Sequence, residues 1–175
     1  MEIAEQLAKL HYTKKLQRQV RFAFWGAEEL GLLGSQYYVE NLTQTQRDKI
    51  YANLNFDMLG SPNYVRFVYD GNGSDTPHAG PPGSDAIEKI FLDYNKSKGL
   101  ATEPTAFYGR SDYGPFIAEG IPAGGLFSGA EGIKTPSTTS TPRRSPNLVM
   151  GRLTPRWSLP CPRQASIQMA AGKRR

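Results

Sequence analysis

The feature that most constrains the fold is the alternation along the chain of short apolar runs with stretches of helical periodicity. Short apolar runs predict strands at residues 20–25, 51–58, 64–69 and 122–127. Helical periodicity predicts helices at residues 3–18, 30–41 and 84–98, and a fourth helix between Ser111 and Gly120. Buried strands that alternate with helices predict an α/β fold, a three-layer αβα sandwich on a mixed, mainly parallel sheet. Ligands in such folds bind at the carboxyl ends of strands.

Three of these segments carry further detail. In residues 51–58 the apolar side chains alternate with Asn53, Asn55 and Asp57, which is typical of a strand with one apolar face. In the helix at residues 84–98, Ser84 is the predicted N-cap, and Gly99 suits the left-handed position that ends a helix. Ser111 or Asp112 is the predicted cap of the fourth helix.

The positive charge of the chain is concentrated at its C-terminal end. The chain has 21 basic and 16 acidic residues, and eight basic but no acidic residues follow position 134, so the preceding part has a net charge of −3. Residues 136–175 are rich in Pro, Ser, Thr and Arg without periodicity, which predicts a disordered segment after a domain at residues 1–135. The abrupt change in composition is also typical of an altered reading frame.

A basic tail raises the possibility of nucleic-acid binding. Trp157 is the only aromatic residue in it, so the tail lacks the stacking side chains of a single-strand binder, and nucleic acid is not an expected partner. Cys161 is the only cysteine, which excludes an internal disulfide. No stretch approaches about 18 apolar residues and the N-terminus is charged, so we expect neither a membrane span nor a signal peptide, and the compartment stays open.

Three carboxylates follow the predicted strands. Glu28 and Glu29 come after the strand at residues 20–25, and Asp57 ends the next one, so all three should meet at one edge of the sheet. Acids at these places also stabilise helix N-termini. Neighbouring residues that leave a strand point in different directions, so one carboxylate could bind a metal while the other acts as a base towards a metal-activated water.

Three ordered motifs extend this interpretation. "FAFWGAEELGLLGS" at residues 22–35, "NLNFDMLGS" at 53–61 and "GRSDYGPFIAEGIPAGGLFSGAEGIKT" at 109–135 closely resemble the co-catalytic dizinc aminopeptidases of the aminopeptidase Y type. The resemblance covers residues 1–135. It implies an α/β exopeptidase that removes N-terminal residues from peptides with a free N-terminus, uses two zinc ions, and belongs to a family whose members are commonly secreted or vacuolar.

The resemblance also assigns roles to individual residues. Glu28 matches the general base, and Glu29 matches a ligand to one zinc. Asp57 matches a ligand to the other zinc, and Arg110 matches the residue near the N-terminus of the substrate. Gly109 would permit close approach of the backbone. The alternative for Arg110 is a surface ion pair.

The family pattern requires five zinc ligands, and this chain matches two of them. The family's upstream H-x-D segment, with its bridging Asp, and its downstream His have no counterpart, and neither His11 nor His78 stands at a family position. We therefore expect the chain as written to be inactive. The resemblance further implies an incomplete sheet, and the exposed edges of such a sheet predict aggregation or a partner.

Two alternatives remain open. The first is a non-catalytic module on the same fold that binds peptides or proteins. The second lies within the enzyme class, because the fold also serves carboxypeptidases and glutaminyl cyclases. The segment "GRSDYGP" and its Arg110 favour the aminopeptidase branch.

Overall fold

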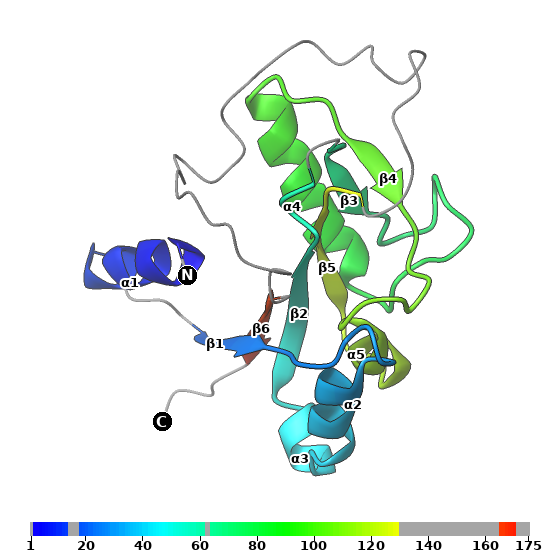
Figure 1. Ribbon diagram of the computed structural model, residues 1–175. Helices are drawn as coiled ribbons and strands as arrows, with labels where there is room; N and C mark the ends of the chain where they lie inside the picture. The colour runs from blue at the N-terminus through cyan, green and yellow to red at the C-terminus, as the bar shows by residue number, and fades with distance from the viewer. Residues whose placement is uncertain (1, 14–17, 62–63, 130–164, 171–175) are drawn as a thin grey trace. The chain divides into compact units, whose positions relative to one another are not determined.

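A computed structural model of the chain describes residues 2–13, 18–61, 64–129 and 165–170 (Figure 1). The helices are α1 (Glu2–Thr13), α2 (Leu33–Glu40), α3 (Gln44–Arg47), α4 (Ser84–Ser97) and α5 (Gly114–Ala118). The strands are β1 (Gln19–Phe24), β2 (Ile50–Asp57), β3 (Phe67–Tyr69), β4 (Glu103–Thr105), β5 (Ala123–Phe127) and β6 (Ala165–Ala170). No described helix is long and apolar enough to cross a bilayer.

The chain divides into two compact units. One comprises Met1–Leu16 with Glu131–Pro162, and its described part is α1, which confirms most of the helix predicted at residues 3–18. The other comprises Gln17–Ala130 with Arg163–Arg175 and contains all the other described elements. The sheet and the candidate site both belong to this second unit.

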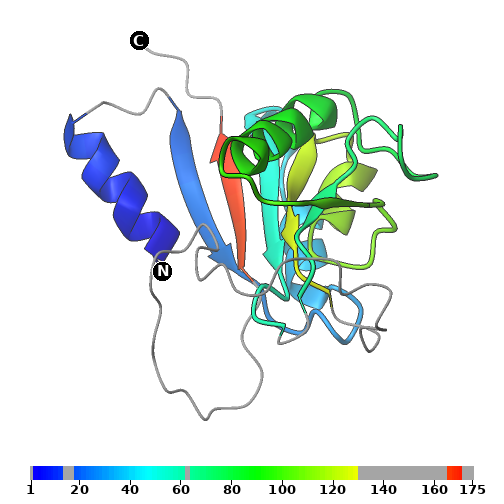
Figure 2. The same ribbon diagram turned by 90° about the horizontal axis from the view of Figure 1, so that it is seen from above.

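The second unit is built on a six-stranded mixed sheet in the order β1-β6-β2-β5-β3-β4 (Figures 1 and 2). The pairs β2–β5 and β3–β4 are parallel, and β1–β6, β6–β2 and β3–β5 are antiparallel. This confirms the predicted α/β fold with a mixed sheet, although parallel and antiparallel pairings are nearly balanced among the described strands.

Strand β6 was not predicted. It lies within the segment at 136–175 for which disorder was expected, yet it pairs with β1 on one side and with β2 on the other. Backbone pairing accounts for its place, because each of those two strands has hydrogen-bonding groups that face the space between them. The rest of that predicted segment, with Trp157 and Cys161, lies outside the described residues.

Helices cover both faces of the sheet, as the sandwich prediction requires. On one face Phe56 of β2 meets Phe91 of α4, with ring centroids 6.2 Å apart. On the other face Asn55 of β2 hydrogen-bonds Ser111, just ahead of α5. Successive residues of a strand point to opposite faces, so α4 and α5 lie on opposite sides of β2, as Figure 2 shows.

The apolar core of this unit forms two buried clusters. Val39, Phe116 and Ile121 join α2 and α5, with Trp25, Tyr38 and Ile50 packed against them. Tyr69, Phe107, Tyr113 and Ala123 form the second cluster, and Tyr69 stacks on Phe107 with centroids 4.9 Å apart. These clusters fix the loop that precedes α5 against the sheet.

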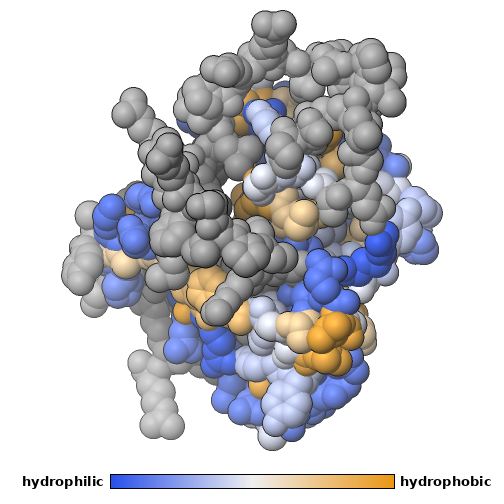
Figure 3. Space-filling model, in the orientation of Figure 1, coloured by the Kyte–Doolittle hydropathy of each residue, from blue (hydrophilic) through white to orange (hydrophobic). Residues whose placement is uncertain are grey.

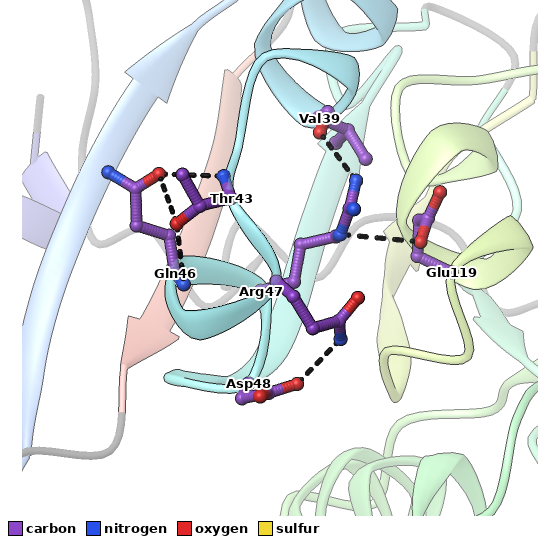
Figure 4. Close-up of polar contacts among 7 residues, drawn as sticks. Val39, Thr43, Gln46, Arg47, Asp48 and Glu119 are labelled. Carbon is purple, nitrogen blue, oxygen red and sulfur yellow. Dashed lines mark hydrogen bonds and ion pairs between the residues drawn. The ribbon is translucent and has the colours of Figure 1, made fainter.

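The short helix α3 begins with a capping box that was not predicted from the sequence. The Thr43 side chain accepts a hydrogen bond from the Gln46 backbone N–H at 3.3 Å, and the Gln46 side chain accepts one from the Thr43 N–H at 2.8 Å (Figure 4). Arg47 then donates to the Val39 carbonyl and lies 3.5 Å from the Glu119 carboxylate. These contacts link α3 to α2 and to the end of α5.

The predicted N-caps of α4 and α5 were wrong by one or two residues. Ser84 is the first residue of α4, and the N-cap is Gly83, with φ of +97°. The Ser84 hydroxyl instead accepts a hydrogen bond from the Ala123 N–H at 3.0 Å, because it faces β5. Helix α5 begins at Gly114 with Tyr113 as its N-cap, and neither Ser111 nor Asp112 caps it, since both side chains turn into the protein interior.

Candidate functional site

The predicted carboxylates follow two strands that run in the same direction. Strands β1 and β2 are both antiparallel to β6, and Phe24 and Phe56 are both in register with Ala165. The carboxyl ends of β1 and β2 therefore lie at the same edge of the sheet. Glu28 follows β1 and Asp57 is the last residue of β2, so the sheet topology brings their backbones to this edge.

A tight turn carries the Glu-Glu pair. Ala27 has a left-handed φ of +57°, and the Glu28 carbonyl accepts hydrogen bonds from Gly31 N–H at 2.9 Å and Leu32 N–H at 2.8 Å. The helix therefore begins at Leu33, three residues later than the sequence suggested. Glu28 is half-buried and Glu29 is exposed. The two neighbouring acids thus differ in their contact with solvent.

Asp57 is the buried member of the group, with only 6% of its surface exposed. The Ser111 hydroxyl donates a hydrogen bond to Asp57 Oδ2 at 2.7 Å, and the Asn55 amide donates one to the Ser111 hydroxyl at 2.9 Å. Asp57 Oδ1 is buried, and no hydrogen bond of normal geometry reaches it from the described residues. The next residue, Met58, has φ of +45°, so a left-handed residue adjoins the site on this side too.

The charges of these carboxylates affect the pKa of two buried groups. Burial raises the pKa of Asp57, and the charge of Glu29 raises it further, while hydrogen bonds from Ser111 and the Met58 backbone partly oppose this. Burial also raises the pKa of Tyr69 well above its usual value, with Tyr113, Asp57 and Glu28 adding to the shift. The charge of Glu29 thus acts on Asp57, and the charges of Asp57 and Glu28 act on Tyr69.

The loop at residues 108–110 is held by Tyr113. Gly109 N–H donates a hydrogen bond to the Tyr113 hydroxyl at 3.1 Å. Gly109 has φ of +72°, which favours glycine, and a Cβ there would meet no atom within 4 Å. Its need for glycine therefore comes from backbone conformation. Arg110 is exposed on the same loop, next to the residue that hydrogen-bonds Asp57.

A fourth carboxylate was not singled out by the sequence. Asp112 is 1% exposed, and neither of its carboxylate oxygens has a hydrogen-bond partner that meets normal geometry. Burial raises its pKa, the nearby Ser35 hydroxyl opposes that shift, and the charge of Asp57 adds to it. The Ser35 hydroxyl itself donates to the Leu32 carbonyl at 3.1 Å.

The alternating polar residues of β2 were a sequence signal for buried polar side chains near the site. Asn53, Asn55 and Asp57 are all at most 6% exposed, so the polar side of β2 is more deeply buried than the half-buried Leu54 and Phe56. Asn55 and Asp57 belong to a buried hydrogen-bonded network, whereas the Asn53 side chain has no hydrogen bond of normal geometry to the described residues. The residues after Arg110 in "GRSDYGP" supply the other half of this network.

The two histidines belong to different units of the chain. The His78 ring packs edge-on against Tyr108, with centroids 4.9 Å apart, and its carbonyl accepts a hydrogen bond from Phe107 N–H. His11 is in the last turn of α1, in the other unit. No group of three or more His, Cys, Asp or Glu side chains that could hold a metal occurs among the described residues.

These residues fit part of a metal site. On Asp57, a buried carboxylate oxygen that receives no hydrogen bond of normal geometry suits a cation, and the charge of Glu29 acts on the same carboxylate. A stable zinc site takes three or four protein ligands. The described residues therefore offer one side of such a site.

The model of the family described as "Peptidase family M28" matches residues 1–146. This chain belongs to that family. The predicted family is thereby confirmed.

Curated relatives agree with the family. The chain is 53% identical over 134 residues to a "probable leucine aminopeptidase 2" of Aspergillus oryzae, covering 77% of this chain and 27% of that protein. It is 53% identical over 135 residues to an "Aminopeptidase" of Pseudomonas aeruginosa, covering 77% of this chain and 24% of that protein. The chain thus spans about a quarter of the length of the curated relatives it matches.

Among solved structures, the chain is similar to a zinc aminopeptidase from Bacillus subtilis. The TM-score is 0.47 at 28% identity, covering 61% of this chain and 25% of that one. An aminopeptidase from an Aneurinibacillus strain matches with a TM-score of 0.46 at 25% identity, covering 59% of this chain and 23% of that one.

Proposed function

We propose that this chain carries the general base and part of the metal-binding side of a zinc aminopeptidase site. In this proposal Glu28 is the general base, Glu29 and Asp57 are metal ligands, and the substrates are peptides with a free N-terminus. The proposal is supported by the sheet topology, which puts the carboxyl ends of β1 and β2 at one edge, and by the burial of Asp57 Oδ1 without a hydrogen-bond partner of normal geometry. The family and the relatives named aminopeptidases support this choice of reaction.

The half-buried position of Glu28 suits the role of a base. Bound zinc supplies polarisation of the scissile carbonyl and a lowered pKa for water. The Glu28 carboxylate takes the proton of the attacking water and passes it to the leaving amine. The loop of Gly109 and Arg110, which directly precedes Ser111, would border the N-terminal residue of the substrate.

We further infer that the 175-residue polypeptide by itself does not hold two zinc ions tightly and does not hydrolyse peptides. The support is the absence, within the described ranges, of any group of three potential ligands. Two nearby divalent cations also repel each other unless bridging carboxylates compensate their charge. Glu29 and Asp57 supply two carboxylates, and a centre of two zinc ions needs more ligands than these.

Zinc binding by the purified 175-residue chain tests the ligand assignment. Calorimetric titration with Zn²⁺ should show weak binding that Glu29→Gln and Asp57→Asn each reduce by about tenfold or more, and that Glu28→Gln leaves within about twofold. Retention of wild-type affinity by Asp57→Asn would contradict the assignment.

Turnover tests the remaining claims. No zinc-dependent release of leucine from a chromogenic leucine amide is expected from the wild-type chain. Release that disappears in Glu28→Gln would overturn the inferred inactivity and would support Glu28 as the base. Two tightly held zinc ions after dialysis, measured by elemental analysis, would show that the ligand set is larger than the one inferred here.

A non-catalytic binding module is the second candidate. The observation that favours it is an apolar surface at the turn into α2, where Leu30 is 74% exposed and Leu33 is 51% exposed. Figure 3 shows apolar surface over this part of the second unit. Strands β1 and β4 are the outer strands of the described sheet, and free edges favour a partner or aggregation. Peptide binding in the presence of a chelator, lost in Leu30→Ser, would support this candidate.

A further inference from the structure

We propose that Asn72 is an acceptor site for an N-linked glycan when the folded chain meets an oligosaccharyltransferase. Three asparagines of the chain stand two residues before a serine or threonine, with no proline between them: Asn41 before Thr43, Asn72 before Ser74, and Asn95 before Ser97. This pattern is the acceptor for N-linked glycans. The proposal is independent of the metal site, and the structure separates the three asparagines by exposure and by hydrogen bonding.

Asn72 lies in the loop between β3 and α4, which extends away from the sheet (Figures 1 and 2). Asn72 and Ser74, the two residues that a transferase has to reach, are both exposed. Ser74 N–H donates a hydrogen bond to the Asn72 amide oxygen at 2.7 Å, and the Ser74 hydroxyl donates one to Asp75 Oδ2 at 3.0 Å. The first of these bonds does not engage the Asn72 amide nitrogen, which is the atom that carries a glycan. The acceptor pattern therefore lies on an exposed loop.

The loop keeps its conformation mainly through Asp70. The Asp70 carboxylate accepts hydrogen bonds from the backbone N–H groups of residues 73–76 and from the Thr76 hydroxyl. Gly73, the middle residue of the pattern, has φ of +71°, which favours glycine, so no side chain stands between the asparagine and the serine. A glycan on Asn72 would leave the hydrogen bonds to Asp70 in place.

The reaction is a substitution at the first sugar of a lipid-linked oligosaccharide, in which that sugar is joined to a polyprenyl diphosphate. A bond forms between Asn72 Nδ2 and the anomeric carbon, and the bond from that carbon to the diphosphate oxygen breaks. The polyprenyl diphosphate leaves with the electron pair, and one of the two amide hydrogens passes as a proton to a base of the transferase. The product keeps its amide oxygen, so the hydrogen bond from Ser74 N–H can persist.

Asn95 has the same pattern, but the fold closes it to modification. It lies in α4 and is 3% exposed, and its amide nitrogen donates a hydrogen bond to the Phe91 carbonyl at 2.8 Å. The closely packed inner side of a helix has no room for a sugar. Asn95 is therefore an internal comparison, with an acceptor pattern that only unfolding would expose.

Asn41 is exposed, but helix ends use both parts of its pattern. Its amide nitrogen donates a hydrogen bond to the Tyr37 carbonyl at 2.8 Å at the end of α2, and the Thr43 hydroxyl belongs to the capping box of α3 (Figure 4). Opening a helix cap of this kind reduces the population that can enter a transferase by about fivefold. Asn72 needs no such opening, so it is the favoured acceptor.

Transfer in vitro to the folded 175-residue chain tests the assignment. The chain is incubated with a purified oligosaccharyltransferase and a lipid-linked oligosaccharide, and mass spectrometry of the glycopeptides identifies the modified asparagines. The main product should carry one glycan, on Asn72, with occupancy of Asn41 lower by about fivefold or more and none on Asn95. Asn72→Gln and Ser74→Ala should each abolish modification of this loop, and Ser74→Thr should preserve it. Asn41→Gln is the matched control and should leave the modification of Asn72 unchanged.

Three synthetic peptides separate the pattern from the fold. Peptides of residues 37–47, 68–78 and 91–101 should all accept the glycan, because Asn95 is not buried in a short peptide. A folded chain that takes the glycan mainly on Asn41 or Asn95 would overturn the proposal. So would a folded chain that takes none on Asn72 while the peptide of residues 68–78 is modified. Failure of that peptide would overturn it as well, because the pattern itself would then not be an acceptor.

Discussion

Gly125 of β5 lies against the backbone carbonyl of Asn55 in β2, with which it is in register, and its φ is +146°. A Cβ at Gly125 would overlap the Asn55 carbonyl oxygen, which is backbone and cannot move aside alone. Gly125→Ala should therefore separate β5 from β2 and lower the free energy of unfolding by roughly 3 kcal/mol or more.

Urea denaturation followed by far-UV circular dichroism measures this change. Gly60→Ala is the control, because a Cβ at Gly60 meets no atom within 4 Å and its backbone does not require glycine. Its effect should stay within about 0.5 kcal/mol. Equal stability of Gly125→Ala and the wild type would mean that β5 and β2 are less closely paired than described.

The sequence predicted the elements with strong periodicity. The strands at residues 20–25, 51–58 and 122–127 and the helix at 84–98 were predicted close to their observed bounds, because their apolar residues follow one period for five residues or more. The order of strand and helix then implied that Glu28, Glu29 and Asp57 share an edge of the sheet. Their assigned roles remain predictions.

What the sequence did not predict depends on pairing between distant segments. Strand β6 forms from a region without periodicity because two other strands need a partner, and β4 spans three residues that include Pro104. The burial of Asn55 and the turn of Ser111 towards Asp57 join residues 56 and 54 positions apart. Local propensity contains no information about such contacts.

The capping box of α3 provides a local test. Thr43→Ala removes the hydroxyl that accepts from the Gln46 N–H, so the free energy of unfolding should fall by about 1 kcal/mol. Thr45→Ala, at an exposed position in the same helix, should change it by less than about 0.5 kcal/mol. Thermal denaturation of the two variants measures the difference. A larger loss for Thr45→Ala would contradict the described start of α3.

Asp70 organises the loop that follows β3. Burial alone would raise its pKa, but hydrogen bonds from the backbones of Asp75, Thr76 and Gly73 and from the Thr76 hydroxyl outweigh burial, so the pKa is lowered from 3.8. The folded state therefore holds the proton less tightly than the unfolded state. The stability that Asp70 supplies is fully present above its unfolded pKa and is lost as pH falls through the lower folded pKa.

Asp70→Asn should thus reduce the free energy of unfolding by roughly 2–3 kcal/mol near pH 7, since several donors lose a charged acceptor. The difference from wild type should shrink as the pH falls below about 4. Asp75→Asn is the control, because Asp75 is exposed on the same loop and should cost less than about 0.5 kcal/mol. Urea denaturation at a series of pH values measures both, and a pH-independent effect of Asp70→Asn would contradict the argument.

The pH dependence of stability that Asp112 contributes should be opposite in direction to that of Asp70. Burial raises its pKa above 3.8, with a further contribution from the charge of Asp57, so the folded state holds the proton more tightly than the unfolded state. The stability linked to this group is fully present below the unfolded pKa and is lost as pH rises through the folded pKa. Asp112→Asn removes the buried charge and should raise the free energy of unfolding near pH 7 by on the order of 1 kcal/mol.

The gain from Asp112→Asn should vanish below about pH 4, where the wild-type carboxyl is protonated in both states. Denaturation is measured with a chelator present, so that no cation offsets the charge. The control is Asp85→Asn in the first turn of α4. It removes a carboxylate from the positive end of the helix and should lower the free energy of unfolding by about 0.3–1 kcal/mol. If Asp112→Asn were less stable than wild type near pH 7, the Asp112 carboxylate would have to receive hydrogen bonds that compensate its burial.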